Sequence, residues 1–169
     1  FSVATTLTKA NIQTSVGNST HDKFTLFVAG KETVTLFGQP IPSNCVGGWC
    51  GTTANIANSV RINQLASAFT YGAYNGVLTD TLSLDDACDL MDNYGVISVV
   101  GTAQGNIIWG IKTLYSLPTS YFAYANVMRV LTNFLRNAFP IAMSALHTDA
   151  CANELTRSGF QQKFSNVVD

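Results

Sequence analysis

The segment from residue 95 to residue 136 constrains the fold of this chain more than any other. Two short runs within it, residues 96–100 and 106–111, are rich in Val and Ile and predict β-strands. The five residues between them, 101–105, begin and end with glycine, which is typical of a hairpin loop. We therefore expect these two runs to pair as neighbouring strands of one sheet.

A long amphipathic helix is expected directly after this hairpin. Pro118 ends the extended segment, and Ser120 has the side chain of an N-cap residue. From Phe122 onward, apolar residues recur at the spacing of one helix face. These positions are Phe122, Tyr124, Val127, Met128, Leu131, Phe134, Leu135 and Ala138.

The predicted hairpin, the segment after it and the start of the helix contain a characteristic series of residues. The series is Gly105, Trp109, Gly110, Lys112, Thr113 and Leu114, then Asn126, Val127, Arg129 and Leu131. The order and separation of the two groups resemble the C-terminal core of contractile tail sheath proteins, which occur in long-tailed phages, R-type bacteriocins and type VI secretion. The resemblance covers about Cys45 to Asp169 and is strongest between Gly95 and Leu135. Nothing in the motif is catalytic, so the resemblance implies structural roles for these residues.

The resemblance implies an α/β fold in the broad sense (α+β). A mixed sheet would hold a strand around residues 24–29 and the two hairpin strands, with helices flanking it. It further implies a structural subunit, not an enzyme, with no cofactor and no metal. Its partners would be other copies of the subunit, joined through terminal arms that add strands, and an inner tail tube protein. The expected location is the virion, assembled in the bacterial host cytoplasm. The alternative is a non-contractile structural or interaction domain of a phage tail or secretion apparatus.

The length of the chain fits one domain with a core of its own. It has 169 residues, of which 47% are hydrophobic, so it is not a disordered tail. We expect a single domain over 1–169, with residues 1–20 extended or a linker and residues 24–169 forming the sheath core. Because the chain starts at Phe1, we expect a fragment of a longer sheath protein, monomeric or weakly associated on its own.

The charge content of the chain is low and bears on its partners. Only 11% of residues are charged, against about a quarter in an average domain. Two interpretations stay open, a monomer with a neutral surface or a subunit whose faces are covered by neighbours. The net charge of -1 argues against a nucleic-acid partner, which needs a clustered basic face. No apolar run approaches the roughly 18 residues of a membrane helix, so no membrane partner is expected.

The remaining elements follow from strand, helix and turn signals along the chain. Strands are predicted at residues 24–30 and 33–38, with a turn at residues 31–32 between them. Residues 39–42 are expected to break the strand pattern, and residues 60–81 to form a loop. Helices are predicted at residues 43–58 with Ser43 as cap, after Ser83, and at residues 150–169. Residues 1–19 fit either an extended segment or a weak helix. Asp86 lies at capping-box spacing from Ser83, and Gly95 should stop that helix. Pro140 should kink or break the long helix.

The residues that could act as catalytic or metal-binding groups also have simple structural explanations. The four cysteines, Cys45, Cys50, Cys88 and Cys151, lack the close pairs of a zinc site, so we expect buried free thiols. In the acidic cluster Asp85, Asp86, Asp89 and Asp92, a helix first turn explains Asp85 and Asp86. A partner-facing acidic patch, a general acid/base pair and a cation site are the alternatives. Lys112 and Arg129 are either solvated or paired. The chain lacks the serine-elbow, phosphate-loop and dinucleotide-binding patterns, which argues against a hydrolase or a nucleotide site.

Overall fold

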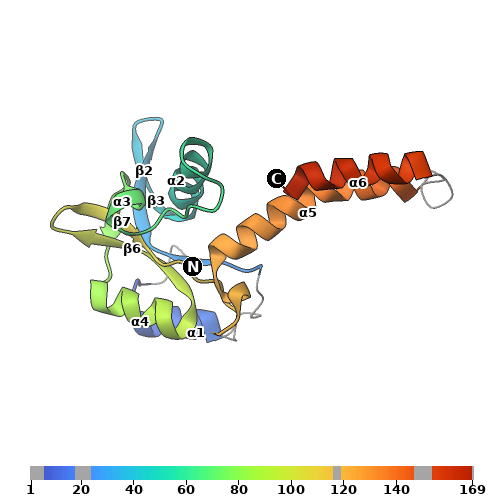
Figure 1. The fold of residues 1–169 in the computed structure, drawn as a ribbon. Coiled ribbons are helices and arrows are strands. Elements are labelled where there is room, and N and C mark those ends of the chain that lie inside the picture. The colour runs from blue at the N-terminus through green and yellow to red at the C-terminus, as the bar shows by residue number, and fades with distance from the viewer. Residues whose placement is uncertain (1–5, 18–23, 116–118, 147–153, 169) are drawn as a thin grey trace. The chain divides into compact units, whose positions relative to one another are not determined.

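The computed structural model describes residues 6–17, 24–115, 119–146 and 154–168. The chain divides into two compact units, Phe1–Met128 and Arg129–Asp169, which we call the first and the second unit. The first unit holds all strands that the structure describes (Figure 1).

The first unit is built on a four-stranded mixed sheet, here called the central sheet. Its strand order is β1 (Phe27–Ala29), β6 (Val96–Thr102), β7 (Gly105–Trp109) and β4 (Ala73–Tyr74). β1 runs parallel to β6, whereas β6–β7 and β7–β4 are antiparallel. The predicted mixed sheet of a strand near residues 24–29 and a hairpin at 96–111 is therefore confirmed. The turn of that hairpin is shorter than expected, because the strands continue through Thr102 and Gly105.

A second, three-stranded antiparallel sheet adjoins the first and is called here the hairpin sheet. Its order is β3 (Gln39–Asn44), β2 (Lys31–Leu36) and β5 (Val77–Asp80). Gly30 alone separates β1 from β2, so one extended stretch of chain passes from the central sheet into the hairpin sheet. A side chain at Gly30 would collide with Cys45, since an added Cβ would lie 2.8 Å from its Sγ atom.

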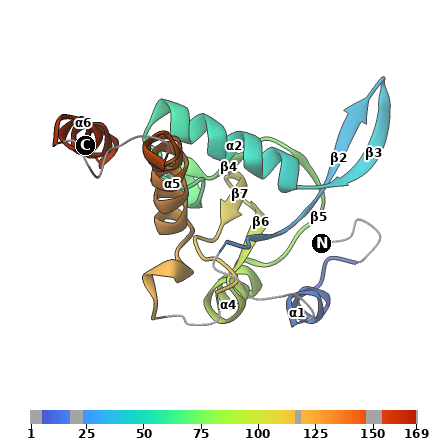
Figure 2. The same cartoon turned by 90° about the vertical axis from the view of Figure 1, so that its right-hand side faces the viewer.

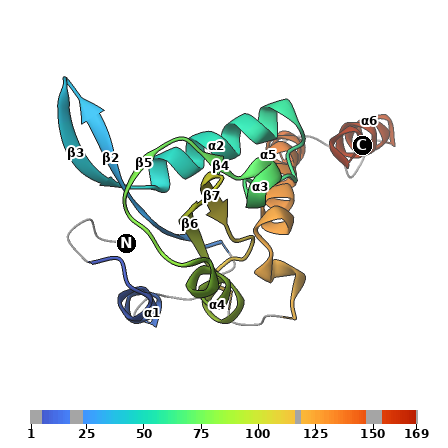
Figure 3. The ribbon, with the colours of Figure 1, turned by 90° about the vertical axis from the view of Figure 1, so that its left-hand side faces the viewer.

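Helices cover both faces of the central sheet, as Figures 2 and 3 show. α1 (Lys9–Gly17) and α4 (Leu84–Tyr94) lie on one face and α2 (Val46–Ser59) lies on the other. On the first face, Val96 packs with Ile12 and Leu90; on the second face, Ile97 packs with Ile56. Residues 96–100 of β6 are all buried because the strand is covered on both sides, which explains its continuous apolar sequence.

The ends of α4 are set by the residues that the sequence indicated. Ser83 Oγ accepts a hydrogen bond from the backbone N–H of Asp86 at 3.1 Å. Gly95 ends the helix in the left-handed region with φ of 67°. A side chain at Gly95 would also collide with the carbonyl oxygen of Thr113, so this glycine is required both by its conformation and by a close approach of the backbone.

Several sequence-based expectations around the hairpin sheet are wrong. Lys31 and Glu32 belong to β2 and do not form a turn. The turn lies instead at Phe37 and Gly38, whose φ values are 51° and 77°. Residues 39–42 form most of β3 instead of breaking the pattern, because prolines are tolerated on an edge strand.

The segment predicted as a loop at residues 60–81 also contains regular structure. It holds α3 (Ala68–Tyr71) together with β4 and β5. These elements are short and lack the sequence alternation of a long strand, which explains why the pattern missed them. The helix predicted at 43–58 is present as α2, but Cys45 occupies the N-cap position in place of Ser43. Of the two alternatives for residues 1–19, the structure has a helix, α1.

The second unit is a pair of helices. α5 (Ala125–Leu146) starts in the first unit and continues into the second, where α6 (Glu154–Val168) follows. Phe134 and Phe164 pack edge to face, with ring centroids 5.8 Å apart. α5 runs through Pro140 without ending there, so the proline does not break the helix. The helix expected from Phe122 begins instead with a short 3₁₀ turn, η1 (Tyr121–Ala123), capped by Ser120. Pro118 and the turn expected at residues 147–149 lie outside the described residues.

Candidate functional site

The two motif glycines lie at either end of β7 and are required for different reasons. Gly105 has φ of 120°, yet an added Cβ would meet nothing within 4 Å, so only its backbone conformation favours glycine. Gly110 has φ of 134°, and an added Cβ would lie 2.8 Å from Ile97 Cα. Its N–H donates to Ser67 Oγ at 3.2 Å. Gly110 therefore lets the chain leave β7 while lying directly against β6.

Trp109 is the last residue of β7 and is half-buried. Its ring packs against a small apolar cluster of Ala87, Val100 and Ile107, which joins α4 to the β6–β7 hairpin. Ser98 is its cross-strand partner. The indole Nε1 atom is buried and has no hydrogen-bond partner within the described part of the chain. The residue thus contributes by packing, with no polar contact visible here.

Lys112 connects the segment after β7 to the C-terminal end of α4. Its Nζ atom lies 3.0 Å from Asp92 Oδ1 and 3.4 Å from the Asp92 carbonyl oxygen. The side chain of Lys112 is 18% exposed, against 60% for that of Asp92. A lysine near the last carbonyl groups of a helix also complements the helix dipole. Of the two alternatives for Lys112, the structure has the paired one.

Thr113 and Leu114 fasten the same segment to three other parts of the first unit. Thr113 is buried, and its Oγ1 atom donates to the Phe122 carbonyl at 3.0 Å while its N–H donates to the Ala123 carbonyl at 2.8 Å. The N–H of Leu114 donates to the carbonyl of Thr25, just before β1, at 3.0 Å. The Leu114 side chain belongs to the core cluster beneath α1 and α4.

Asn126 and Arg129 lie one turn apart at the start of α5 and are both half-buried. The first turn is attached to the rest of the first unit, because the N–H of Ala125 donates to the Ile111 carbonyl at 2.9 Å. Burial lowers the pKa of the Arg129 guanidinium from its ordinary value, although an arginine stays charged at physiological pH. The motif therefore forms one continuous connection from β7 past the end of α4 and the start of β1 to α5.

None of this geometry assembles a reactive site. No group of three or more His, Cys, Asp or Glu residues that could hold a metal occurs among the described residues. A cavity of about 330 Å³ is lined by Thr6, Lys31, Pro42, Ser43, Thr79 and Asp80. None of the four clustered aspartates, Asp85, Asp86, Asp89 and Asp92, lines this cavity. His147 lies outside the described residues.

The cysteines that the structure describes form no disulfide and differ in burial. Cys45, Cys50 and Cys88 are free; Cys45 is buried as expected, but Cys50 is exposed, so the expectation of buried thiols is wrong there. Cys151 lies outside the described residues. Burial raises the pKa of the Cys45 thiol to about 11, which keeps it protonated and unreactive at neutral pH.

Three of the four clustered aspartates take part in ion pairs. Asp86 and Asp89 lie 3.8 Å and 3.0 Å from Lys9 Nζ, and Asp92 pairs with Lys112. The hydrogen bond from Lys9 holds the pKa of Asp89 below its ordinary value. These pairs attach α1 and the motif segment to α4, which accounts for most of the cluster.

Sequence reasoning missed one buried polar pair in the first unit. Tyr74 of β4 and Glu32 of β2 are both buried and hydrogen-bonded to each other. The sequence placed Glu32 in a turn and Tyr74 in a loop, so no pattern brought the two together.

Comparison with known proteins gives no match to a family model and no match to a curated protein sequence. Solved structures do match. A chain of the PVC sheath complex in its contracted state, from an extracellular contractile injection system, is 18% identical, with a TM-score of 0.72 over 96% of this chain and 44% of that chain. This chain has the fold of a contractile sheath domain.

Two further chains support the same fold. A chain of the contracted helical sheath of the anti-feeding prophage has a TM-score of 0.68 and 11% identity, over 87% of this chain and 40% of its own. A chain of the baseplate of the same particle has a TM-score of 0.69 and 12% identity, over 86% of this chain and 38% of its own. This sheath-like chain thus spans less than half the length of the chains it matches.

Proposed function

We propose that this chain is the core domain of a contractile sheath subunit, which polymerises around an inner tail tube and contracts to drive the tube through a cell envelope. The observation that carries the proposal is the fold, shared over 86% to 96% of the chain with two sheath chains and a baseplate chain of contractile particles. Its role is structural and not enzymatic, and it needs no cofactor.

The chain as a whole, residues 1–169, would be one part of a longer sheath protein. The matched chains are more than twice as long, since the alignment spans 38% to 44% of each. Terminal arms of neighbouring subunits would add strands and join the copies into a polymer. On its own, the 169-residue chain would be monomeric or weakly associated.

The work of contraction would be stored in the interfaces between subunits. Heterologous contacts that do not close into a ring produce a helical polymer. Subunits that move as rigid bodies and gain contact area need no nucleotide. The charged fraction of only 11% supports extensive contact with other copies, because few charges have to lose water.

The motif residues would keep the domain rigid while it moves. Gly105 and Gly110 would fix the two ends of β7, next to Trp109. Lys112, Thr113 and Leu114 would hold the following segment against the rest of the first unit. Asn126 and Arg129 lie in the first turns of α5. A load applied to α5 would then reach the central sheet through backbone hydrogen bonds, such as the one from Ala125 to Ile111, and not through a flexible loop.

The proposed location is the particle itself, a phage virion or a related contractile particle, assembled in the bacterial host cytoplasm. No helix among the described residues is both long and apolar enough to span a bilayer. Neither nucleic acid nor a membrane is a proposed partner.

Electron microscopy of the full-length protein tests the proposal. Tubular polymers with the dimensions of a contracted sheath are expected after overexpression. Discrete particles without tubes would contradict it and favour the alternative, a non-contractile structural domain of a tail or secretion apparatus.

A further inference from the structure

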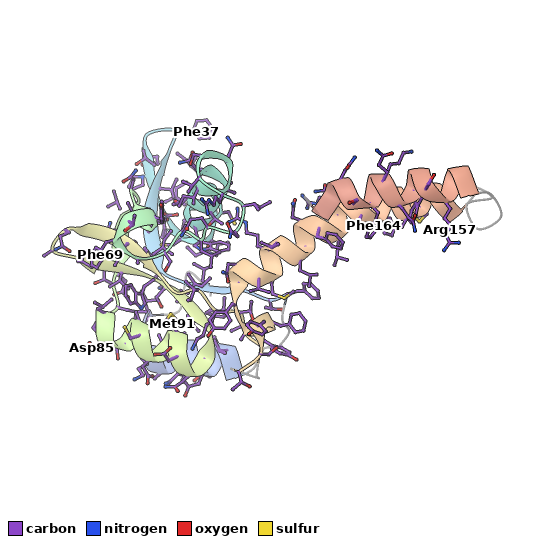
Figure 4. The ribbon with its side chains drawn as sticks, in the orientation of Figure 1. Phe37, Phe69, Asp85, Met91, Arg157 and Phe164 are labelled. Atoms are coloured by element: carbon purple, nitrogen blue, oxygen red, sulfur yellow. The ribbon has the colours of Figure 1, made fainter. Side chains whose placement is uncertain are left out.

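The hairpin formed by β2 and β3 extends beyond the packed body of the first unit. Residues 35–42 are all exposed, and Phe37 at the tip is fully exposed. Figures 2 and 3 show the two strands projecting away from the central sheet, and Figure 4 shows the Phe37 ring at the end of the projection. This projecting segment exposes three large apolar side chains, those of Leu36, Phe37 and Ile41.

The strand register separates the hairpin into two different faces. Side chains of directly paired residues lie on the same face of a sheet, and successive residues alternate. Val34 pairs with Ile41, and Leu36 follows Val34 on the same side, so these three residues form an apolar face that ends at Gln39, the partner of Leu36. The opposite face carries Thr33, Thr35, Pro40, Pro42 and, from β5, Val77.

The apolar face continues the side of the sheet that is buried at the base of the hairpin. Glu32 precedes Val34 on this face and is buried, and its partner across the strands, Leu78, packs against the core cluster of α2 and the central sheet. Beyond this base the same side is uncovered: Leu36 is 48% exposed and Ile41 is 42% exposed. The face of the hairpin that is buried at its base is therefore apolar but exposed to solvent toward its tip.

The outer edge of β3 cannot extend the sheet in the regular way. Leu36 pairs with Gln39 across the two-residue turn, so this pair exchanges the hydrogen bonds that close the hairpin. Hydrogen-bonded and non-hydrogen-bonded pairs alternate, so the backbone of residues 40 and 42 faces away from β2. Both residues are proline, which has no N–H to donate. An added strand would find acceptors but no donors there, so the β3 edge does not favour strand addition and a face of the hairpin is the better surface for a partner.

The occupant of that face must itself be largely apolar and uncharged. Residues 33–42 contain no charged side chain, which excludes attraction to nucleic acid or to an anionic membrane surface. The closed edge argues against an extended peptide. We propose that the apolar face of the β2–β3 hairpin, formed by Val34, Leu36 and Ile41, packs against a second copy of this chain. The identity of the partner rests on the proposed function; two of the matched chains come from assembled sheaths.

Site-specific photo-crosslinking in the full-length protein tests this inference. A photoreactive phenylalanine derivative replaces Ile41 on the apolar face in one variant and Val77 on the opposite face in the other. Val77 is the stricter control because it is 69% exposed, against 42% for Ile41, and would react more often in random collisions. Heavy-isotope-labelled and unlabelled copies are mixed, so that crosslinks between two copies carry both labels.

The expected result is several-fold more mixed-label crosslinking from position 41 than from position 77. Equal yields, or crosslinks only within one copy, would overturn the inference. The pair Leu36 and Thr35 repeats the comparison if either variant misfolds. Tubes without preferential crosslinking at position 41 would refute the inference alone, whereas preferential crosslinking without tubes would refute the sheath function alone.

Discussion

Tyr74 Oη donates a hydrogen bond to Glu32 Oε2 at 2.5 Å, and this pair joins the central sheet to the hairpin sheet. Both side chains are buried. Two glycines make room for the phenol: a Cβ added at Gly48 or at Gly76 would collide with the Tyr74 ring. Tyr74, the two glycines beside its ring and the buried Glu32 carboxylate together form a specific connection between the sheets. The hairpin depends on this connection because its outer part has no core of its own.

Removing the hydroxyl of Tyr74 should loosen this connection. Tyr74→Phe leaves the ring in place but leaves the buried Glu32 carboxylate without its donor, which costs about 1–3 kcal/mol. We expect the free energy of unfolding in urea to fall by that amount. Tyr121→Phe is the matched control, because Tyr121 is exposed and should give no change. Equal stability of the two variants would show that the hydrogen bond does not support the fold.

The stability of the first unit should fall at alkaline pH because of Cys45. Burial raises the pKa of its thiol from 9.0 to about 11 in the folded state. Between these values the unfolded state releases the proton while the folded state keeps it, so rising pH favours unfolding. The free energy of unfolding, measured from about pH 8 to about pH 11, should decline less steeply for Cys45→Ala than for the wild type. Parallel pH profiles would contradict the assignment.

Gly110→Ala should destabilise the protein more than Gly105→Ala. Both glycines have a positive φ, so both substitutions introduce backbone strain of about 1–3 kcal/mol. Only at Gly110 would the new methyl group also press against the backbone of Ile97. Urea unfolding of the two variants, which serve as controls for each other, measures the difference. If Gly105→Ala were the more destabilising variant, the close approach of residue 110 to Ile97 of β6 would not explain why glycine is required at position 110.

Trp109→Ala should reduce the stability of the fold by about 3 kcal/mol or more, as expected for loss of a large packed aromatic side chain. The indole packs against Ala87, Val100 and Ile107, the cluster where α4 meets the β6–β7 hairpin. Because Nε1 makes no hydrogen bond to a described residue, Trp109→Phe should retain a good part of that stability. Thermal unfolding followed by circular dichroism measures both variants, and an unchanged melting temperature for the alanine variant would refute the prediction.

The elements that the sequence predicted well are those whose signals are local. The β6–β7 hairpin has two apolar runs around a short turn, and α4 has a capping serine and a terminal glycine. The hairpin sheet was misread because its signals are not local. Pro40 and Pro42 normally argue against a strand, and they fit β3 only because their positions face away from β2.

The connection between the sheets could not be read from the sequence either. Glu32 and Tyr74 are 42 residues apart, and a buried carboxylate beside Lys31 has the sequence appearance of an exposed turn. At the motif, glycine and tryptophan positions could be singled out by resemblance, but their physical reasons required coordinates. The approach of Gly110 to Ile97 and the pairing of Lys112 with Asp92 depend on contacts across the fold.

Adding backbone N–H donors to the outer edge of β3 should make the hairpin prone to aggregation by strand pairing between molecules. The double variant Pro40→Val and Pro42→Val supplies two outward N–H groups and, with Ile41, makes three consecutive β-branched residues, which is the composition of an aggregation-prone edge. We expect faster growth of thioflavin T fluorescence and light scattering than for the wild type. Thr35→Val is the control, since it adds an apolar β-branched side chain on the same face as Pro40 without a new donor. If the control aggregated as fast as the double variant, side-chain hydrophobicity and not the missing donors would govern this edge, and the prolines would have no protective role.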